Sequence, residues 1–138
     1  MSCVLRASGR DFDVDSFLKG STLKPLIVHH RGERRFPDSK IQPGVQSGMN
    51  VSVSEREFSD LAGQIEDAIL FIQKNAEELH RLRDFPGMER IDIDFPIRDR
   101  DVAVQCDAFP PKLLSLLGEL RIGLVISRYP ASENPTQA

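Results

Sequence analysis

The feature that most constrains this chain is the apolar spacing between Ser54 and Arg83, which predicts one long amphipathic helix. Apolar side chains recur there every three or four residues, so at about 100° per residue they fall on a stripe about 120° wide. We expect this stripe to face the core and the charged residues between its members to face water. The stripe consists of Phe58, Leu61, Ala62, Ile65, Ala68, Ile69, Ile72, Ala76 and Leu79.

Both ends of this predicted helix carry capping signals. Ser54, with Glu57 three residues later, matches a capping box, in which each side chain satisfies a backbone N–H at the helix start. Arg81 and Arg83 suit the negative end of the helix dipole. Thirty residues would make about 45 Å of helix, whereas a domain of this length is about 35–40 Å across. The helix must therefore span the molecule, protrude or bend, and Asn75 is the candidate bend.

The flanking segments alternate apolar and polar residues, which is typical of half-buried strands. This order, β-α-β-β-α-β-β-α-β, predicts an α+β two-layer sandwich with a mainly antiparallel sheet, a long central helix and two short helices, of ferredoxin-like character. The predicted strands are 3–8, 26–30, 49–53, 91–95, 102–107 and 122–129, and the short helices are 13–20 and the segment after Pro110-Pro111. We expect one domain over residues 1–130, a mobile loop at 33–48 and a flexible tail at 131–138.

Composition narrows the classes of function. A net charge of −3 and a pI near 5.6 disfavour nucleic-acid binding, and the predicted outward strand faces carry no aromatic side chains for stacking on RNA bases. No apolar run approaches the roughly 18 residues of a membrane span. The N-terminal residues lack the apolar segment of a signal peptide, which favours the cytoplasm. Cys3 and Cys106 could form a disulfide, but in a reducing compartment we expect them to be free, inward-facing thiols.

The segment SGRDFDVDSFLKGSTLKPLIVHHRGE resembles the opening of an uncharacterised, mainly bacterial family, the domain-of-unknown-function family DUF4279. The resemblance continues in SGMNVSVS, in AEELHRLRDFPG and in PPKLLSLLGELRIGLVISRY, and it covers residues 2–129. Met49-Asn50 departs from the pattern, because a tryptophan is expected after Gly48. The resemblance implies a fold, and it supplies no activity and no catalytic residues.

The stretch HHRGERR is the most concentrated basic segment of the chain. Its arginines could hold a carboxylate or phosphate through fork-shaped donors, or they could be the solvated end of a strand. The adjacent histidines cannot both point to one side of a strand, because side chains alternate. The candidate binding residues in this segment are His29, Arg31, Arg34 and Arg35.

Asp92 and Asp94 form the second candidate site, because they share the outer face of a predicted strand about 7 Å apart. Two carboxylates could perform acid–base chemistry or hold a hard cation. Arginines at 90, 98 and 100 interleave with them and equally indicate a charge-balanced surface. The sequence contains no P-loop, no nucleophile elbow and no Cys or His at zinc-ligand spacing, so it predicts no metal and no cofactor.

Phe71 and Leu82 lie on the predicted long helix but outside its core stripe. Either a second helix or the long loop covers them, or this flank is a homodimer interface with an aromatic anchor at its centre.

Two hypotheses about function stay open at this point. The first is a non-enzymatic module that binds another protein, such as an immunity-like or accessory factor. The second is a small-anion-binding or enzymatic domain that uses the Arg-rich strand end opposite Asp92 and Asp94. A protein partner is expected under the first hypothesis and a small ligand under the second.

Overall fold

The computed structural model describes residues 2–33 and 44–131. In this part of the chain, five strands and four helices confirm the predicted α+β class. The elements are β1 (Cys3–Gly9), α1 (Val14–Lys19), β2 (Pro25–His29), β3 (Ser47–Ser54), α2 (Leu61–Lys74), α3 (Ala76–Asp84), β4 (Arg90–Arg98), α4 (Pro111–Leu120) and β5 (Gly123–Tyr129).

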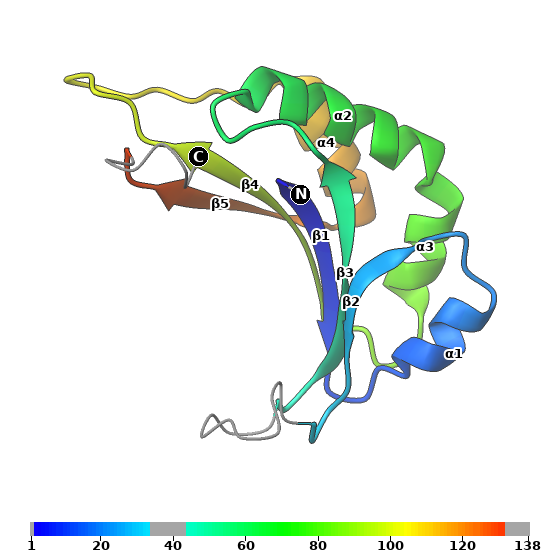
Figure 1. The fold of residues 1–138 in the computed structure, drawn as a ribbon. Helices are drawn as coiled ribbons and strands as arrows, with labels where there is room; N and C mark the ends of the chain where they lie inside the picture. Colours follow the sequence, from blue (N-terminus) through cyan, green and yellow to red (C-terminus); the bar gives the residue numbers. More distant parts are fainter. Residues whose placement is uncertain (1, 34–43, 132–138) are drawn as a thin grey trace.

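The strands form one sheet in the order β2-β3-β1-β4-β5. Three of the four pairings are antiparallel, and β4 with β5 is parallel. A parallel pair needs a crossover connection, and α4 provides it between these two strands. Figure 1 shows the helices together on one side of the sheet, so the opposite face carries none of them. The ferredoxin-like character that the element order suggested is not confirmed.

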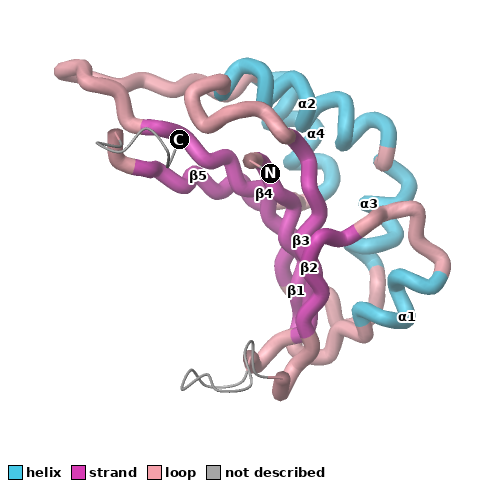
Figure 2. The backbone as a smooth tube through the Cα atoms, in the orientation of Figure 1, coloured by secondary structure: helices cyan, strands magenta, loops and turns pink. Residues whose placement is uncertain are grey.

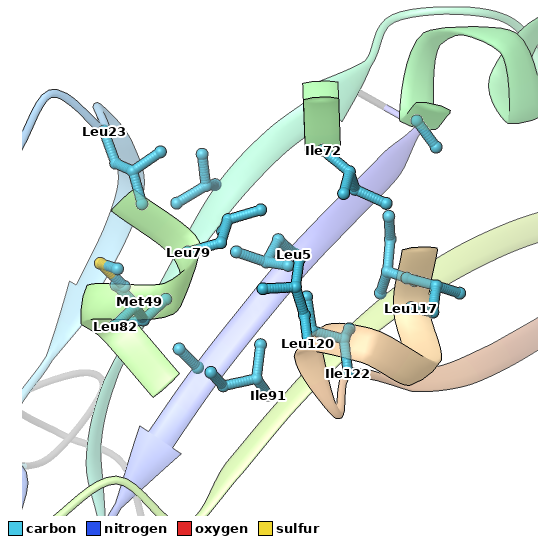
Figure 3. Close-up of a cluster of buried hydrophobic side chains, with 14 of the residues drawn as sticks. Leu5, Leu23, Met49, Ile72, Leu79, Leu82, Ile91, Leu117, Leu120 and Ile122 are labelled. Carbon is cyan, nitrogen blue, oxygen red and sulfur yellow. The ribbon is translucent and has the colours of Figure 1, made fainter. Parts of the chain in front are cut away.

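The core fills the space between the sheet and the helix layer (Figure 3). On β1 the inward side chains alternate strictly: Cys3, Leu5 and Ala7 are buried in it. On α2 and α3 the predicted stripe supplies Ile65, Ala68, Ile72 and Leu79, all of them buried, which confirms that part of the helix prediction. Burying a large aliphatic side chain contributes about 1.5–3 kcal/mol, so these helices are held mainly by the sheet beneath them.

The caps of the two short helices agree with the sequence. Asp13 accepts a hydrogen bond from the Ser16 backbone N–H at 3.1 Å and begins α1. Pro111 stands in the first turn of α4, where its missing N–H costs nothing. Arg121 ends α4 with a positive φ of 53°.

The predicted start of the long helix is wrong. Ser54 is the last residue of β3, and its hydroxyl donates a hydrogen bond to the Asp67 carboxylate at 2.7 Å. The actual cap is Asp60, which accepts a hydrogen bond from the Gly63 N–H at 2.9 Å, so α2 begins at Leu61. Two equivalent capping signals lie six residues apart, and pairing of β3 with its neighbours decides between them.

The long helix is also broken, and the break lies at Asn75, the predicted bend. This residue has a non-helical φ of −108°, and its side-chain amide donates to the Phe71 carbonyl at 2.9 Å. The segment therefore forms two helices that follow the sheet, instead of one helix longer than the domain.

The predicted hairpin after the helices is only half correct. Residues 102–107 form no strand, and Val102, Val104 and Cys106 are exposed. The place beside β4 is taken by β5, which pairs with it from Asp92 to Arg98. The prediction that Cys106 faces inward is thus wrong, whereas Cys3 is buried, and both cysteines are free.

Several expectations concern residues that the structure does not describe. Most of the predicted loop 33–48 and nearly all of the predicted tail 131–138 lie outside the described residues. Within residues 2–33 and 44–131, no helix is long and apolar enough to cross a bilayer.

Candidate functional site

The sheet face opposite the helices is a candidate surface to which all five strands contribute, and we call it the open face. Figure 2 shows it free of helices along the described strands. Its side chains are those that alternate with the core residues, and the strand register arranges them in rows. The rows are His29, Gly48, Ser8 and Arg90; Ile27, Asn50, Arg6, Asp92 and Gly123; and Ser52, Val4, Asp94 and Val125.

The Arg6–Asp94 ion pair crosses the middle of the open face. An Arg6 guanidinium nitrogen lies 2.7 Å from an Asp94 carboxylate oxygen. Ser127 donates its hydroxyl to the same carboxylate, 2.8 Å from one oxygen and 2.9 Å from the other. Asp94 is only 4% exposed. A carboxylate with so little access to water needs these partners, so the cluster connects β1, β4 and β5.

Asp92 lies beside this cluster and pairs with Arg90 on the same strand. Gly123 of β5 lies opposite it, and a Cβ there would come within 2.4 Å of an Asp92 carboxylate oxygen. Glycine at this position therefore lets the carboxylate lie against the neighbouring strand.

The prediction that Asp92 and Asp94 share one face is confirmed, but each carboxylate has its own arginine. Two paired carboxylates are poor candidates for a general base or for ligands of a hard cation. Among the described residues, no group of three or more His, Cys, Asp or Glu side chains is placed to hold a metal ion.

The basic strand end lies at the other end of the sheet. His29 sits over Gly48, where a Cβ would approach the imidazole ring to 3.0 Å. Arg31 donates its backbone N–H to the Ser47 hydroxyl at 2.8 Å and pairs with Asp11 at 3.2 Å. The candidates Arg34 and Arg35 lie outside the described residues.

His29 and Asp92, which come from the two parts of the predicted joint site, lie on strands that are not neighbours. His29 is on β2 and Asp92 is on β4, with β3 and β1 between them. Three inter-strand spacings separate them by about 14 Å. A small anion could not contact both His29 and Asp92. Arg34 and Arg35 lie outside the described residues, so the expected arrangement of an Arg-rich end opposite the two carboxylates stays a prediction.

Two shallow hollows border the basic strand end, with volumes of about 400 Å³ and about 640 Å³. Arg10 and Arg31 line both. The first is otherwise lined by Asp11, Phe12, Asp13, Val14, His30 and Ser47, and the second by Gly32, Gly44, Val45, Gln46 and Glu89. Their charges are mixed, and ligand pockets are usually enclosed and mostly apolar, so neither hollow resembles a developed small-molecule site.

His30 connects β2 to α1 beside the first hollow. Its Nε2 lies 2.9 Å from an Asp15 carboxylate oxygen, and its Nδ1 lies 3.2 Å from Glu33. Hydrogen bonds to Glu33 and Asp15 raise the pKa of His30 above its ordinary value of 6.5. Only the imidazolium can donate to both carboxylates at once.

This contact predicts a pH dependence of stability. The pKa of His30 is higher in the folded chain than in the unfolded chain. The contribution of protonated His30 to the free energy of unfolding is therefore fully present below pH 6.5 and is lost as the pH rises through the raised pKa. Urea unfolding of the wild type and of His30→Gln across this range measures the effect. The difference in unfolding free energy should shrink with rising pH, and a constant difference would contradict the contact.

Phe71 and Leu82 do not form an exposed flank together. Leu82 is completely buried, and Phe71 is partly buried against the core. The bend at Asn75 explains Leu82, because α3 no longer continues the α2 axis and turns this side chain toward the sheet. The expectation that Leu82 offers an interface is therefore wrong.

Strand alternation in the sequence predicts that Arg6, Asn50 and Ser52 face outward, but it does not identify their partners. The Asp94–Ser127 and Arg6–Asp94 contacts join residues that are far apart along the chain. No local pattern reveals such contacts. Cys3 belongs to the same region: burial and the nearby Asp94 raise the pKa of its thiol, so it is a poor nucleophile.

Comparisons with known proteins add no relatives: no family model, no curated protein and no solved structure matches this chain. The resemblance to the DUF4279 family therefore stays a prediction.

Proposed function

We propose that this protein is a non-enzymatic binding module that engages another protein through the open face, in the manner of an immunity or accessory factor. The observation that carries the proposal is the absence of any helix on this face in the part of the chain that the structure describes (Figure 1). The opposite face carries all the described helices, so only the open face presents a broad set of side chains from all five strands.

The chemistry of the open face fits a macromolecular partner. Asn50, Ser8 and Ser52 offer hydrogen-bonding groups, and Arg6 is half-exposed although it is paired with Asp94. Protein interfaces carry about one hydrogen bond per 100–200 Å² and are often enriched in arginine. The ion pair is held in place before any partner arrives, which lowers the ordering cost of binding.

The alternative is a small-anion site at the basic strand end. One observation favours it: Arg10 and Arg31 line both hollows. Asp11 already neutralises Arg31, and Glu89 lines the larger hollow. The open face is therefore the stronger candidate.

Asn50→Tyr tests the proposal. Asn50 is partly exposed and lies between Ile27 and Arg6 in its row, and tyrosine is favoured in strands, so the fold should tolerate it. The added ring projects from the face and should exclude a partner surface. In affinity capture from cells that naturally contain the protein, the wild type should retain a protein in near-stoichiometric amount, and Asn50→Tyr should lose at least about nine-tenths of it, a loss of about 1.4 kcal/mol in affinity.

The matched control is Gln73→Tyr, which adds the same ring on the exposed surface of α2. It should capture as much partner as the wild type. Equal capture by all three proteins, or loss by the control alone, would contradict the use of the open face.

A further inference from the structure

The two edge strands of the sheet differ in the features that would prevent another strand from pairing with them. An edge strand presents a row of unpaired backbone N–H and C=O groups, and proteins usually protect it with proline, lysine, bulges or short length. In the described sheet, β2 forms one edge and β5 the other.

The β2 edge carries several of these protections. It has only five residues, it begins at Pro25 directly after Lys24, and its register against β3 shifts between Pro25 and Ile27. Proline has no N–H to donate to a neighbouring strand. Leu26, Ile27 and Val28 are exposed, but an incoming strand would meet an interrupted ladder.

Within residues 123–129, the β5 edge carries none of these protections. Its seven residues, GLVISRY, contain no proline and no lysine, and they pair with β4 in unbroken register. The single charge is Arg128, and its guanidinium pairs with Asp99 of the same chain at 2.8 Å. The outer side of β5 therefore offers a regular ladder of backbone groups.

The helix-side face of β5 adds apolar surface to this ladder. Leu124 lies beside Ile93 and Ile126 beside Phe95 in the register. Ile93 and Phe95 are completely buried, whereas Leu124 is 36% and Ile126 47% exposed. The apolar surface of the helix-side face thus continues from β4 onto β5, where the side chains are only partly covered. Another apolar strand beside β5 would bury both Leu124 and Ile126.

We propose that a second copy of this chain occupies the edge, with the two β5 strands antiparallel about a twofold axis near Val125. In this register, Leu124 of each copy lies opposite Ile126 of the other. Residues from Ile122 to Ser127 are uncharged, so no like charges meet at the centre. A twofold axis requires a surface that complements itself, and a neutral strand with alternating apolar residues meets this requirement.

The resulting ten-strand sheet keeps both open faces on the same side. The dimer thus doubles the proposed partner surface without covering it, and the inference goes beyond the proposed function and does not depend on it.

The test is the mass in solution across a concentration series, measured by sedimentation equilibrium. The wild type should approach twice the 15.5 kDa chain mass. Ile126→Lys places a charge beside the axis and should weaken dimerisation at least about a hundredfold. Leu124→Lys should act in the same direction, and circular dichroism checks that both variants fold.

Val28→Lys is the matched control, because it places the same charge on the helix-side face of the other edge strand. It should dimerise like the wild type. A wild type that stays monomeric at millimolar concentration overturns the proposal. This outcome also covers the possibility that β5 pairs with a strand of a different protein instead of with a second copy. A dimer that survives both β5 variants, or that only Val28→Lys disrupts, overturns it as well.

Discussion

Phe17→Ala should lower the free energy of unfolding by about 3–5 kcal/mol, the range for truncating a buried phenylalanine. Phe17 is completely buried, and its ring centroid lies 5.4 Å from that of Phe85 and 6.2 Å from that of Phe12. The Arg81 guanidinium lies 4.1 Å from the ring centroid. The six-residue α1 is too short to be stable alone, so this cluster fixes it against α3.

Chemical denaturation of Phe17→Ala and of Leu70→Ala measures this effect. Leu70 is 59% exposed on α2, and its truncation should change stability by less than about 0.5 kcal/mol. A loss below about 1 kcal/mol for Phe17→Ala would show that α1 is not anchored through this ring.

Arg6→Met should cost about 2–3 kcal/mol, because it leaves a nearly inaccessible carboxylate with one hydroxyl partner. The Arg6 side chain is 48% exposed, so water screens part of the interaction, and the expected loss stays below the range for fully buried pairs. Ser127 still donates to both oxygens of Asp94.

A double-mutant cycle isolates the pair. Arg6→Met combined with Asp94→Leu removes both charges, and the double variant should be less destabilised than the sum of the single variants by at least about 1 kcal/mol. Additive losses in urea unfolding would contradict an energetic coupling across the open face.

The predictions that succeeded depend on local patterns. Alternation in Cys3, Leu5 and Ala7 is enough to place β1 and its inner face, and Asp13 and Pro111 mark helix starts by their own chemistry. The stripe through Ile65 and Ile72 is periodic over many residues. The buried face of the helices could therefore be predicted from the sequence, although their exact ends could not.

The predictions that are wrong concern features that residues distant in sequence determine. Ser54 and Asp60 are both good caps, and the pairing of β3 decides which one is used. Val102 and Val104 alternate like a strand, yet β5 occupies the only position beside β4 that they could have taken. The sequence of either segment alone does not show which of two competing segments forms the element.

The candidate site was predictable only in part. Alternation placed Asp92 and Asp94 on one outward face, but their pairing with Arg90 and Arg6 changes their chemistry from free carboxylates to fixed ion pairs. The sequence contains each partner, and only the strand register brings Arg6 to Asp94.

Thiol labelling at position 50 shows whether the open face is accessible in the purified protein and covered in a complex. In a Cys106→Ser background, Asn50→Cys and Gln73→Cys place one accessible thiol on the open face and one on α2, while Cys3 stays buried. We expect both thiols to react with a maleimide in the purified protein. In the complex captured from cells, the thiol at position 50 should be protected and the thiol at position 73 should still react. An unreactive thiol at position 50 in the purified protein, or equal reactivity there with and without the captured partner, would contradict a free sheet face that binds another protein.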